Sequence, residues 1–181
     1  MEQKMSKEDE LKGLGGWLIL VGLGVVIGPF RLLFTLVPMY LPFFQDGLWE
    51  DYTSPTSNYY VPYFDLFIIG EIALNTMIIS ACFYLIYLFF SKSYLFPRFF
   101  IGVMLATLIL IPLDAWLFTL LFPSEEMFDP ETTVEFLRSV IYGAIWIPYM
   151  LVSKRVKATF VEGRPEPQGA GTLGINQRFE R

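Results

Sequence analysis

The chain has 181 residues, of which 54% are hydrophobic and 17% are charged, and its formal net charge is -5. Because an average soluble domain has about 25% charged residues, this composition excludes a soluble, a disordered or a nucleic-acid-binding protein. The single cysteine excludes a disulfide framework, and the absence of histidine removes the commonest metal ligand and the commonest general base.

Four apolar stretches have the length of membrane-spanning helices, which need about 20 apolar residues to cross a hydrocarbon core of about 30 Å. They cover residues 14–36, 66–90, 99–121 and 134–152. The first is too long for the apolar part of a signal peptide and is not followed by a small-residue cleavage site, so we expect it to be retained. The sequence therefore predicts an all-α integral membrane protein with one four-helix domain over residues 14–161.

The remaining segments are predicted to lie outside the membrane. Residues 1–13 form a leader, and residues 162–181 form a tail whose glycines and prolines predict disorder. The connections 37–65 and 122–133 are predicted on the outer side, and the first of them begins with a stretch apolar enough to lie along the interface.

The distribution of charge predicts the orientation. Eleven of the thirteen basic residues lie in three segments: three in the leader, two in the link between the second and third spans, and six in the C-terminal segment from residue 153 onwards. The two outer connections, taken with Glu135, contain nine acidic residues and no basic one. Because basic residues near span ends resist translocation, both termini are predicted in the cytoplasm, against anionic lipid headgroups.

Apart from Glu135, which is counted with the outer connection, each span contains one charged residue: Arg31, Glu71, Asp114 or Arg138. At 1.5 Å per residue all four are expected within about 6 to 10 Å of the outer hydrocarbon boundary, as one layer without net charge. Asn75 follows Glu71 by one turn, and Tyr142 follows Arg138 by one turn. Two interpretations stay open: a satisfied network that sets helix register, or an outward-facing pocket whose carboxylates bind a proton, cation or basic group while the arginines bind an anionic headgroup.

Small residues and prolines lie near the charged residues of the first and third spans. Gly24 and Gly28 form a small-x-x-x-small pair that is typical of close helix approach. Pro29 and Pro112 precede Arg31 and Asp114 by two residues, and each is expected to kink its helix.

Catalytic, metal and cofactor sites are not predicted. Ser-His and Cys-His pairs lack their histidine, and no span contains a lysine that would activate a serine. An oxygen-only metal site at Glu71, Asn75 and Asp114 would lie beside two arginines that repel cations. The sequence therefore predicts that the protein is not an enzyme.

Two strings resemble a known family. They are Leu14-Gly15-Gly16-Trp17-Leu18 at the start of the first span, and Ile147-Pro148-Tyr149 with the basic string Ser153-Lys154-Arg155-Val156-Lys157-Ala158-Thr159-Phe160-Val161 after the fourth. Together they resemble the bacterial membrane family catalogued as domain of unknown function 2569, over residues 13–161. The resemblance implies a four-helix protein of the bacterial inner membrane, and it supplies no reaction and no catalytic residue.

The two strings are expected at the same cytoplasmic level, where they can pack together. Their candidate contacts with lipid or a partner are Trp17, Lys154, Arg155, Lys157 and Phe160. Plain anchoring in headgroups and docking of a partner protein both fit this basic, partly apolar string.

The sequence favours an accessory, assembly or interaction subunit of a membrane complex. The alternative is a small transporter or a proton- or ion-coupled carrier that uses the charge layer, and a third hypothesis is a lipid-handling enzyme. Four short spans leave little room for an enclosed aqueous path, so transport would require oligomerisation. The expected partners are membrane lipids and a membrane protein or a second copy of the chain, and nucleic acid is excluded.

Overall fold

The computed structural model describes residues 12–164, which form six helices in chain order. They are α1 (Trp17–Gln45), α2 (Leu48–Thr53), α3 (Phe64–Phe90), α4 (Phe96–Leu121), α5 (Pro130–Val152) and α6 (Lys154–Thr159). The helices α1, α3, α4 and α5 are each long and apolar enough to cross a membrane. This confirms the predicted all-α membrane fold with four such helices, whereas most of the predicted leader and tail lies outside the described residues.

The first helix is longer than the span predicted from the sequence. The apolar stretch predicted from the sequence ends at residue 36, whereas α1 continues through Pro38 and Pro42 to Gln45, although each proline removes a helix donor. Contacts with α3 hold this last part: Tyr40 hydrogen bonds to Asn75, and the rings of Phe43 and Phe64 lie 6.1 Å apart. The predicted outer connection 37–65 is therefore the end of α1, the short helix α2 and a turn.

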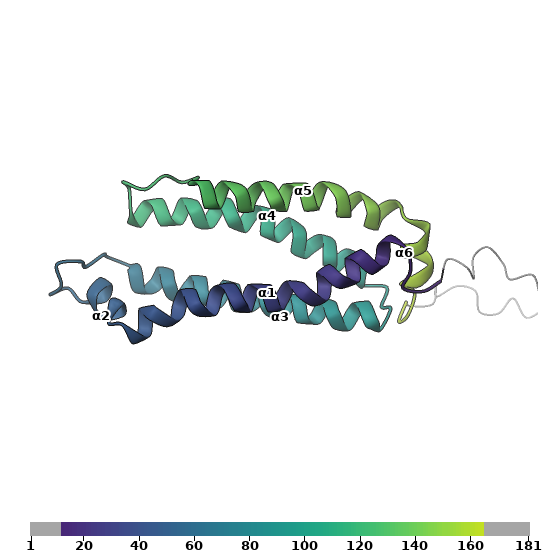
Figure 1. Cartoon of the computed structure of the whole chain (residues 1–181), viewed down its shortest axis with the longest axis horizontal. Helices are drawn as coiled ribbons and strands as arrows, with labels where there is room; N and C mark the ends of the chain where they lie inside the picture. Colours follow the sequence, from purple (N-terminus) through teal and green to yellow (C-terminus); the bar gives the residue numbers. More distant parts are fainter. Residues whose placement is uncertain (1–11, 165–181) are drawn as a thin grey trace, which may run out of the picture.

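The four long helices pack as two pairs. Helix α1 packs on α3 and α4 packs on α5, and contacts between α3 and α4 join the pairs. Figure 1 shows the pairs converging at the end where α6 lies and separating toward the end where α2 lies. We call the end with Trp17, Phe90, Phe96 and Val152 the closed end, and the opposite end the open end.

The hydrophobic core lies at the closed end. Its buried residues are Leu18, Val21, Val25, Leu85, Leu88, Phe89, Phe96, Phe100, Met150, Val156 and Phe160. Helix α6 contributes Val156 to this core, and Phe160, directly after α6, stacks its ring on that of Phe96 with centroids 4.5 Å apart. Aromatic pairs of this kind contribute about 0.5 to 1.5 kcal/mol beyond the burial of their area.

The open end is held by a smaller aromatic group. Tyr52 of α2 stacks on Phe64 at 4.8 Å, and Phe122, just after α4, meets the edge of both rings. Few other side chains are buried in this half. Along α3 and α4, the polar residues Glu71, Asn75 and Asp114 lie between the core and this aromatic group.

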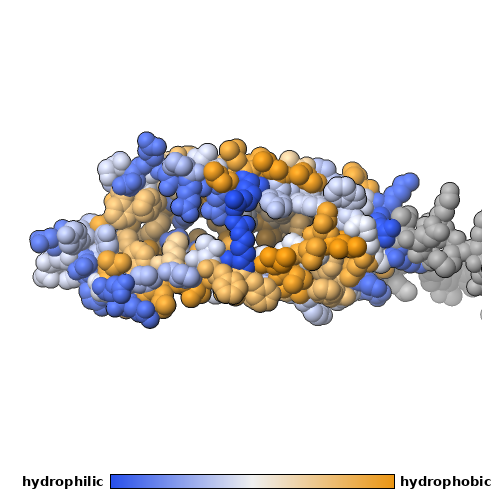
Figure 2. Space-filling view, in the orientation of Figure 1, coloured by the Kyte–Doolittle hydropathy of each residue, from blue (hydrophilic) through white to orange (hydrophobic). Residues whose placement is uncertain are grey.

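The surface has the polarity expected of a membrane protein. Figure 2 shows hydrophobic residues along the helices and hydrophilic residues gathered at both ends, with one hydrophilic group crossing the middle of this face. Exposed hydrophobic side chains occur on all four long helices, as contact with lipid requires.

Candidate functional site

Polar side chains of α1 and α3 meet in the open half. The amide nitrogen Nδ2 of Asn75 donates to the hydroxyl oxygen of Tyr40 at 3.0 Å, and the Glu71 carboxyl lies near enough to this hydroxyl for the two groups to interact. Glu71 and Asn75 share one face of α3 because they are four residues apart. Side chains lean toward the start of their own helix, so Tyr40 and Asn75, on antiparallel helices, lean toward each other.

Two more carboxylates extend this group. Asp114 of α4 lies close enough to Glu71 for their charges to interact, and Glu135 of α5 interacts in the same way with Asp114. We call Tyr40, Glu71, Asn75, Asp114 and Glu135 the polar cluster. All four long helices contribute to it, and its members are half-buried except for the exposed Glu135.

The polar cluster offers acceptor oxygens that suit a cation or an amine. Three carboxylates repel one another, and a positive group placed between them would offset that repulsion. Among residues 12–164, however, no three acidic or sulfur side chains approach closely enough to form a metal site.

Within residues 12–164, Arg31 and Arg138 are not ion-paired to the polar cluster. Both side chains are exposed, and within the described range neither forms an ion pair with Glu71 or Asp114. The neutral, ion-paired layer expected from the sequence is therefore not formed by these residues.

The positions of the four charged residues along their helices explain part of the difference between the expected layer and the structure. Measured from the open end of each helix, Glu71 and Asp114 lie seven residues in, Arg138 eight and Arg31 fourteen. At 1.5 Å per residue these positions correspond to about 10, 10, 12 and 21 Å. Arg31 lies deeper than expected because α1 extends nine residues beyond the end predicted at 36.

Arg138 and Tyr142 lie on an exposed face of α5. Together with Val134, Leu137 and Ile141 they line a shallow groove of about 340 Å³. The lining of this groove includes neither Tyr40 nor Asn75. The six residues predicted as one layer therefore lie in three places: Glu71, Asn75 and Asp114 in the polar cluster, Arg138 and Tyr142 in the groove, and Arg31 on α1.

The two glycine and basic strings pack together at the closed end. The hydroxyl of Thr159 bonds to the backbone of Gly13, and the Arg155 guanidinium covers Gly15, where a Cβ atom would lie 3.0 Å from Nη1. Gly16 has a φ of 59°, a conformation that residues with a Cβ atom rarely adopt. The close approach of Arg155 therefore explains the glycine at position 15, and the positive φ explains the glycine at position 16.

The residues predicted to contact lipid or a partner are not equally accessible. Trp17 is 65% exposed, and Lys154 and Lys157 are exposed as well. Arg155 is half-buried, and Phe160 is only 2% exposed because it belongs to the core. Phe160 is therefore not a surface contact, and we call Trp17, Lys154 and Lys157 the basic face.

The start of the predicted tail is ordered against the loop between α3 and α4. The amide of Tyr94 donates to the carbonyl of Glu162 at 3.1 Å, and the amide of Glu162 donates to the carbonyl of Lys92 at 3.2 Å. Disorder predicted from residue 162 is thus wrong for its first residues, which form a bridge beside Ser93.

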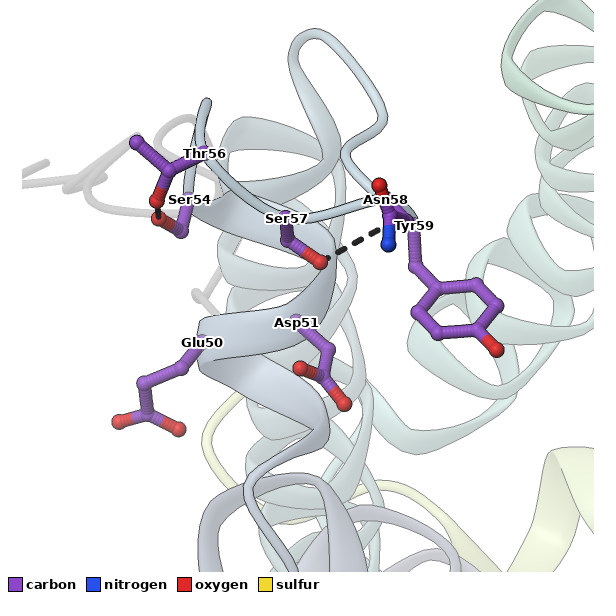
Figure 3. Close-up of a pocket in the computed structure, with 7 residues that line it drawn as sticks. All are labelled: Glu50, Asp51, Ser54, Thr56, Ser57, Asn58 and Tyr59. Atoms are coloured by element: carbon purple, nitrogen blue, oxygen red, sulfur yellow. Dashed lines mark hydrogen bonds between the residues drawn. The ribbon is translucent and has the colours of Figure 1, made fainter.

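A second hollow, of about 380 Å³, lies at the open end between α2 and the following turn. Figure 3 shows the side chains of Glu50 and Asp51 extending from α2, with the hydroxyl groups of the turn above them in this view. The hydroxyl oxygen of Ser57 accepts from the amide of Tyr59 at 3.1 Å, and the hydroxyls of Ser54 and Thr56 lie 2.9 Å apart. These bonds stabilise the turn that leads into α3.

Sequence reasoning missed Tyr40 and Glu135 as members of the polar cluster. Tyr40 was assigned to the outer connection 37–65, although it lies on α1. Glu135 was counted only as an acidic residue near a span end, but its position three residues before Arg138 already placed it within one turn of the layer.

Comparison with known proteins gives one match. Neither the curated proteins nor the solved structures contain a match to this chain. A family model described as "Protein of unknown function (DUF2569)" matches residues 11–161, in agreement with the resemblance of the two terminal strings. The match covers most of the chain, including all four long helices and α6, and the chain therefore belongs to the DUF2569 family.

Proposed function

We propose that this protein is an accessory or interaction subunit of a complex in the bacterial inner membrane, and that its basic face docks on a membrane-protein partner. Both termini would be cytoplasmic. Exposed Lys92, Arg98, Lys154 and Lys157 lie at the closed end, and acidic residues gather at the open end. Basic residues concentrate on the cytoplasmic side of membrane proteins, which supports this orientation.

The observation that carries the proposal is the order of α6. Val156 is 1% exposed and Thr159 is 3% exposed, so one face of this short helix is buried, as is Phe160 directly after it. Attraction to lipid headgroups requires only positive charge near the surface. A folded α6 holds Lys154 and Lys157 in a defined arrangement at the closed end, and a protein partner requires such an arrangement.

The closed-end core also disfavours a carrier made from one chain. Leu18, Phe96 and other apolar side chains separate the polar cluster from the closed end. A carrier must open its site to both sides of the membrane, and here the most tightly packed part of the molecule lies across that route.

The experiment is co-purification in native lipids of the full chain and two variants. Lys154→Gln/Lys157→Gln removes two charges from the basic face. Lys92→Asn/Arg98→Gln removes two exposed charges at the same end, and asparagine tolerates the positive φ of 52° at residue 92. We expect a stoichiometric membrane partner to be retained by the control variant and lost from the first one.

Equal retention of the partner in both variants, or the absence of any stoichiometric partner, would contradict docking through the basic face. Equal loss in both would indicate that only the total positive charge at this end matters.

A second candidate function, a proton- or ion-coupled carrier, is favoured by the convergence of carboxylates from α3, α4 and α5. It predicts that Glu71→Gln and Asp114→Asn fold normally and abolish ion-dependent uptake into vesicles. If both variants retain the partner and no uptake is lost, the carrier hypothesis is excluded for these carboxylates.

A further inference from the structure

The groove on α5 combines an apolar lining with one cation. Val134, Leu137 and Ile141 are each more than half exposed, and they extend along two turns of the helix. Arg138 and Tyr142 lie beside them, and Ile145 continues the exposed apolar stripe toward the closed end. The groove of about 340 Å³ is shallow and open to the surroundings of the helix, where lipid would lie.

Arg138 has no anionic partner within the described chain. Its side chain is exposed, and within residues 12–164 it has no ion pair or hydrogen bond. A charge at membrane depth costs several kcal/mol unless it pairs or reaches the interface. Arg138 is about 12 Å from Pro130 along the axis, and it leans toward the helix start, so its guanidinium approaches the headgroup level of the open-end leaflet.

The surrounding charges select the kind of anion. Glu135 and Glu131 precede Arg138 by about one and two turns, and both are exposed toward the open end. Glu135 also interacts by charge with Asp114 of α4. A headgroup that carries only negative charge would meet Arg138 favourably but would be repelled by these carboxylates.

We propose that this groove binds a zwitterionic phospholipid of the open-end leaflet, with its phosphate on Arg138, its terminal ammonium toward Glu135 and an acyl chain over Leu137 and Ile141. In such a lipid the phosphate lies nearer the acyl chains than the ammonium does. The order of charges along α5, cation deeper and carboxylates nearer the open end, is complementary to that arrangement. The proposal does not depend on the docking function of the closed end.

The test is native mass spectrometry of the full chain, purified in detergent and supplied with phosphatidylethanolamine and phosphatidylglycerol that have the same acyl chains. We expect one retained lipid per chain, with phosphatidylethanolamine preferred. Arg138→Gln should lower retention about tenfold or more, since it removes a charge-assisted hydrogen bond. Arg31→Gln is the matched control, because Arg31 is also exposed at membrane depth but does not line the groove, and it should retain the lipid.

Two further variants separate the parts of the site. Leu137→Trp fills the groove without changing charge and should also lower retention. Glu135→Gln should keep a bound lipid but reduce the preference for phosphatidylethanolamine. Equal retention in the Arg138→Gln and Arg31→Gln variants, or a preference of the unmodified protein for phosphatidylglycerol, would overturn the proposal.

Discussion

The hydroxyl of Thr159 binds both backbone groups of Gly13, accepting from its N–H at 3.1 Å and donating to its carbonyl at 3.2 Å. The two residues are 146 positions apart in the chain. One buried hydroxyl thus joins the segment before α1 to the end of α6, next to the hydrophobic core of the closed end.

Thr159→Val keeps the shape of the side chain and removes both of these hydrogen bonds. We expect the free energy of unfolding to fall by about 1 to 3 kcal/mol, because two backbone groups of Gly13 lose their partner. Thermal unfolding in detergent, followed by circular dichroism, measures the change. Thr159→Ser keeps the hydroxyl and is the control, so equal stability of the two variants would contradict this role.

Gly22, and not the pair Gly24 and Gly28, is where another helix approaches α1 closely. A Cβ atom at Gly22 would lie 2.8 Å from the buried ring of Phe89, whereas nothing in the described chain lies within 4 Å of one at Gly24 or Gly28. Gly22→Ala should therefore destabilise the protein by about 1 to 3 kcal/mol through overpacking.

Gly24→Ala is the matched control for this substitution. It should be neutral or stabilise the protein by up to about 1 kcal/mol, since alanine favours helix more than glycine does. Chemical unfolding in mixed micelles compares the two variants, and a larger loss at Gly24 than at Gly22 would contradict the packing of α1 on Phe89.

Tyr40→Phe removes the hydroxyl that joins α1 to α3 in the polar cluster. Interhelical hydrogen bonds in membranes contribute about 0.6 kcal/mol on average, and up to about 1.7 kcal/mol, so we expect a loss within that range. The unfolding free energy in detergent is the measurement. Tyr142→Phe removes a hydroxyl that has no hydrogen bond within residues 12–164, and a loss as large as that of Tyr40→Phe would contradict the assignment.

Asp129 caps the start of α5 and gives a testable dependence on pH. Its oxygen Oδ1 accepts from the amide of Thr132 at 2.7 Å, and this bond lowers the pKa of the Asp129 carboxyl below its usual value. The cap therefore stabilises the helix start above the unfolded pKa of about 3.9. This stabilisation is lost as the pH falls through the lower pKa of the folded state.

An NMR titration of the Thr132 amide should therefore show a midpoint below about 3.9. Asp129→Asn keeps an acceptor oxygen but does not ionise, so its titration should be flat. A midpoint at or above the ordinary value in the unmodified protein would show that the cap does not favour the charged carboxylate.

The candidate site was only partly predictable from sequence. The charged residues of the spans indicated a polar layer, and Glu71, Asn75 and Asp114 do lie near one another's level in the open half. The pairing with Arg31 and Arg138 was inferred from neutrality alone. Spacing along a helix does not say which face points toward a neighbour, and both arginines are exposed and without an ion pair among the described residues.

The amino-acid sequence by itself determined the helical membrane fold, because backbone groups in lipid must be satisfied within each segment and 20 or so apolar residues leave few alternatives. It also determined the family, through the strings at the two ends. Only the tertiary structure decided that α1 continues through Pro38 and Pro42, that Phe160 lies in the core, and that Tyr40 meets Asn75. These outcomes depend on contacts between helices, which local composition does not specify, since lipid and protein interior are equally apolar surroundings for a side chain.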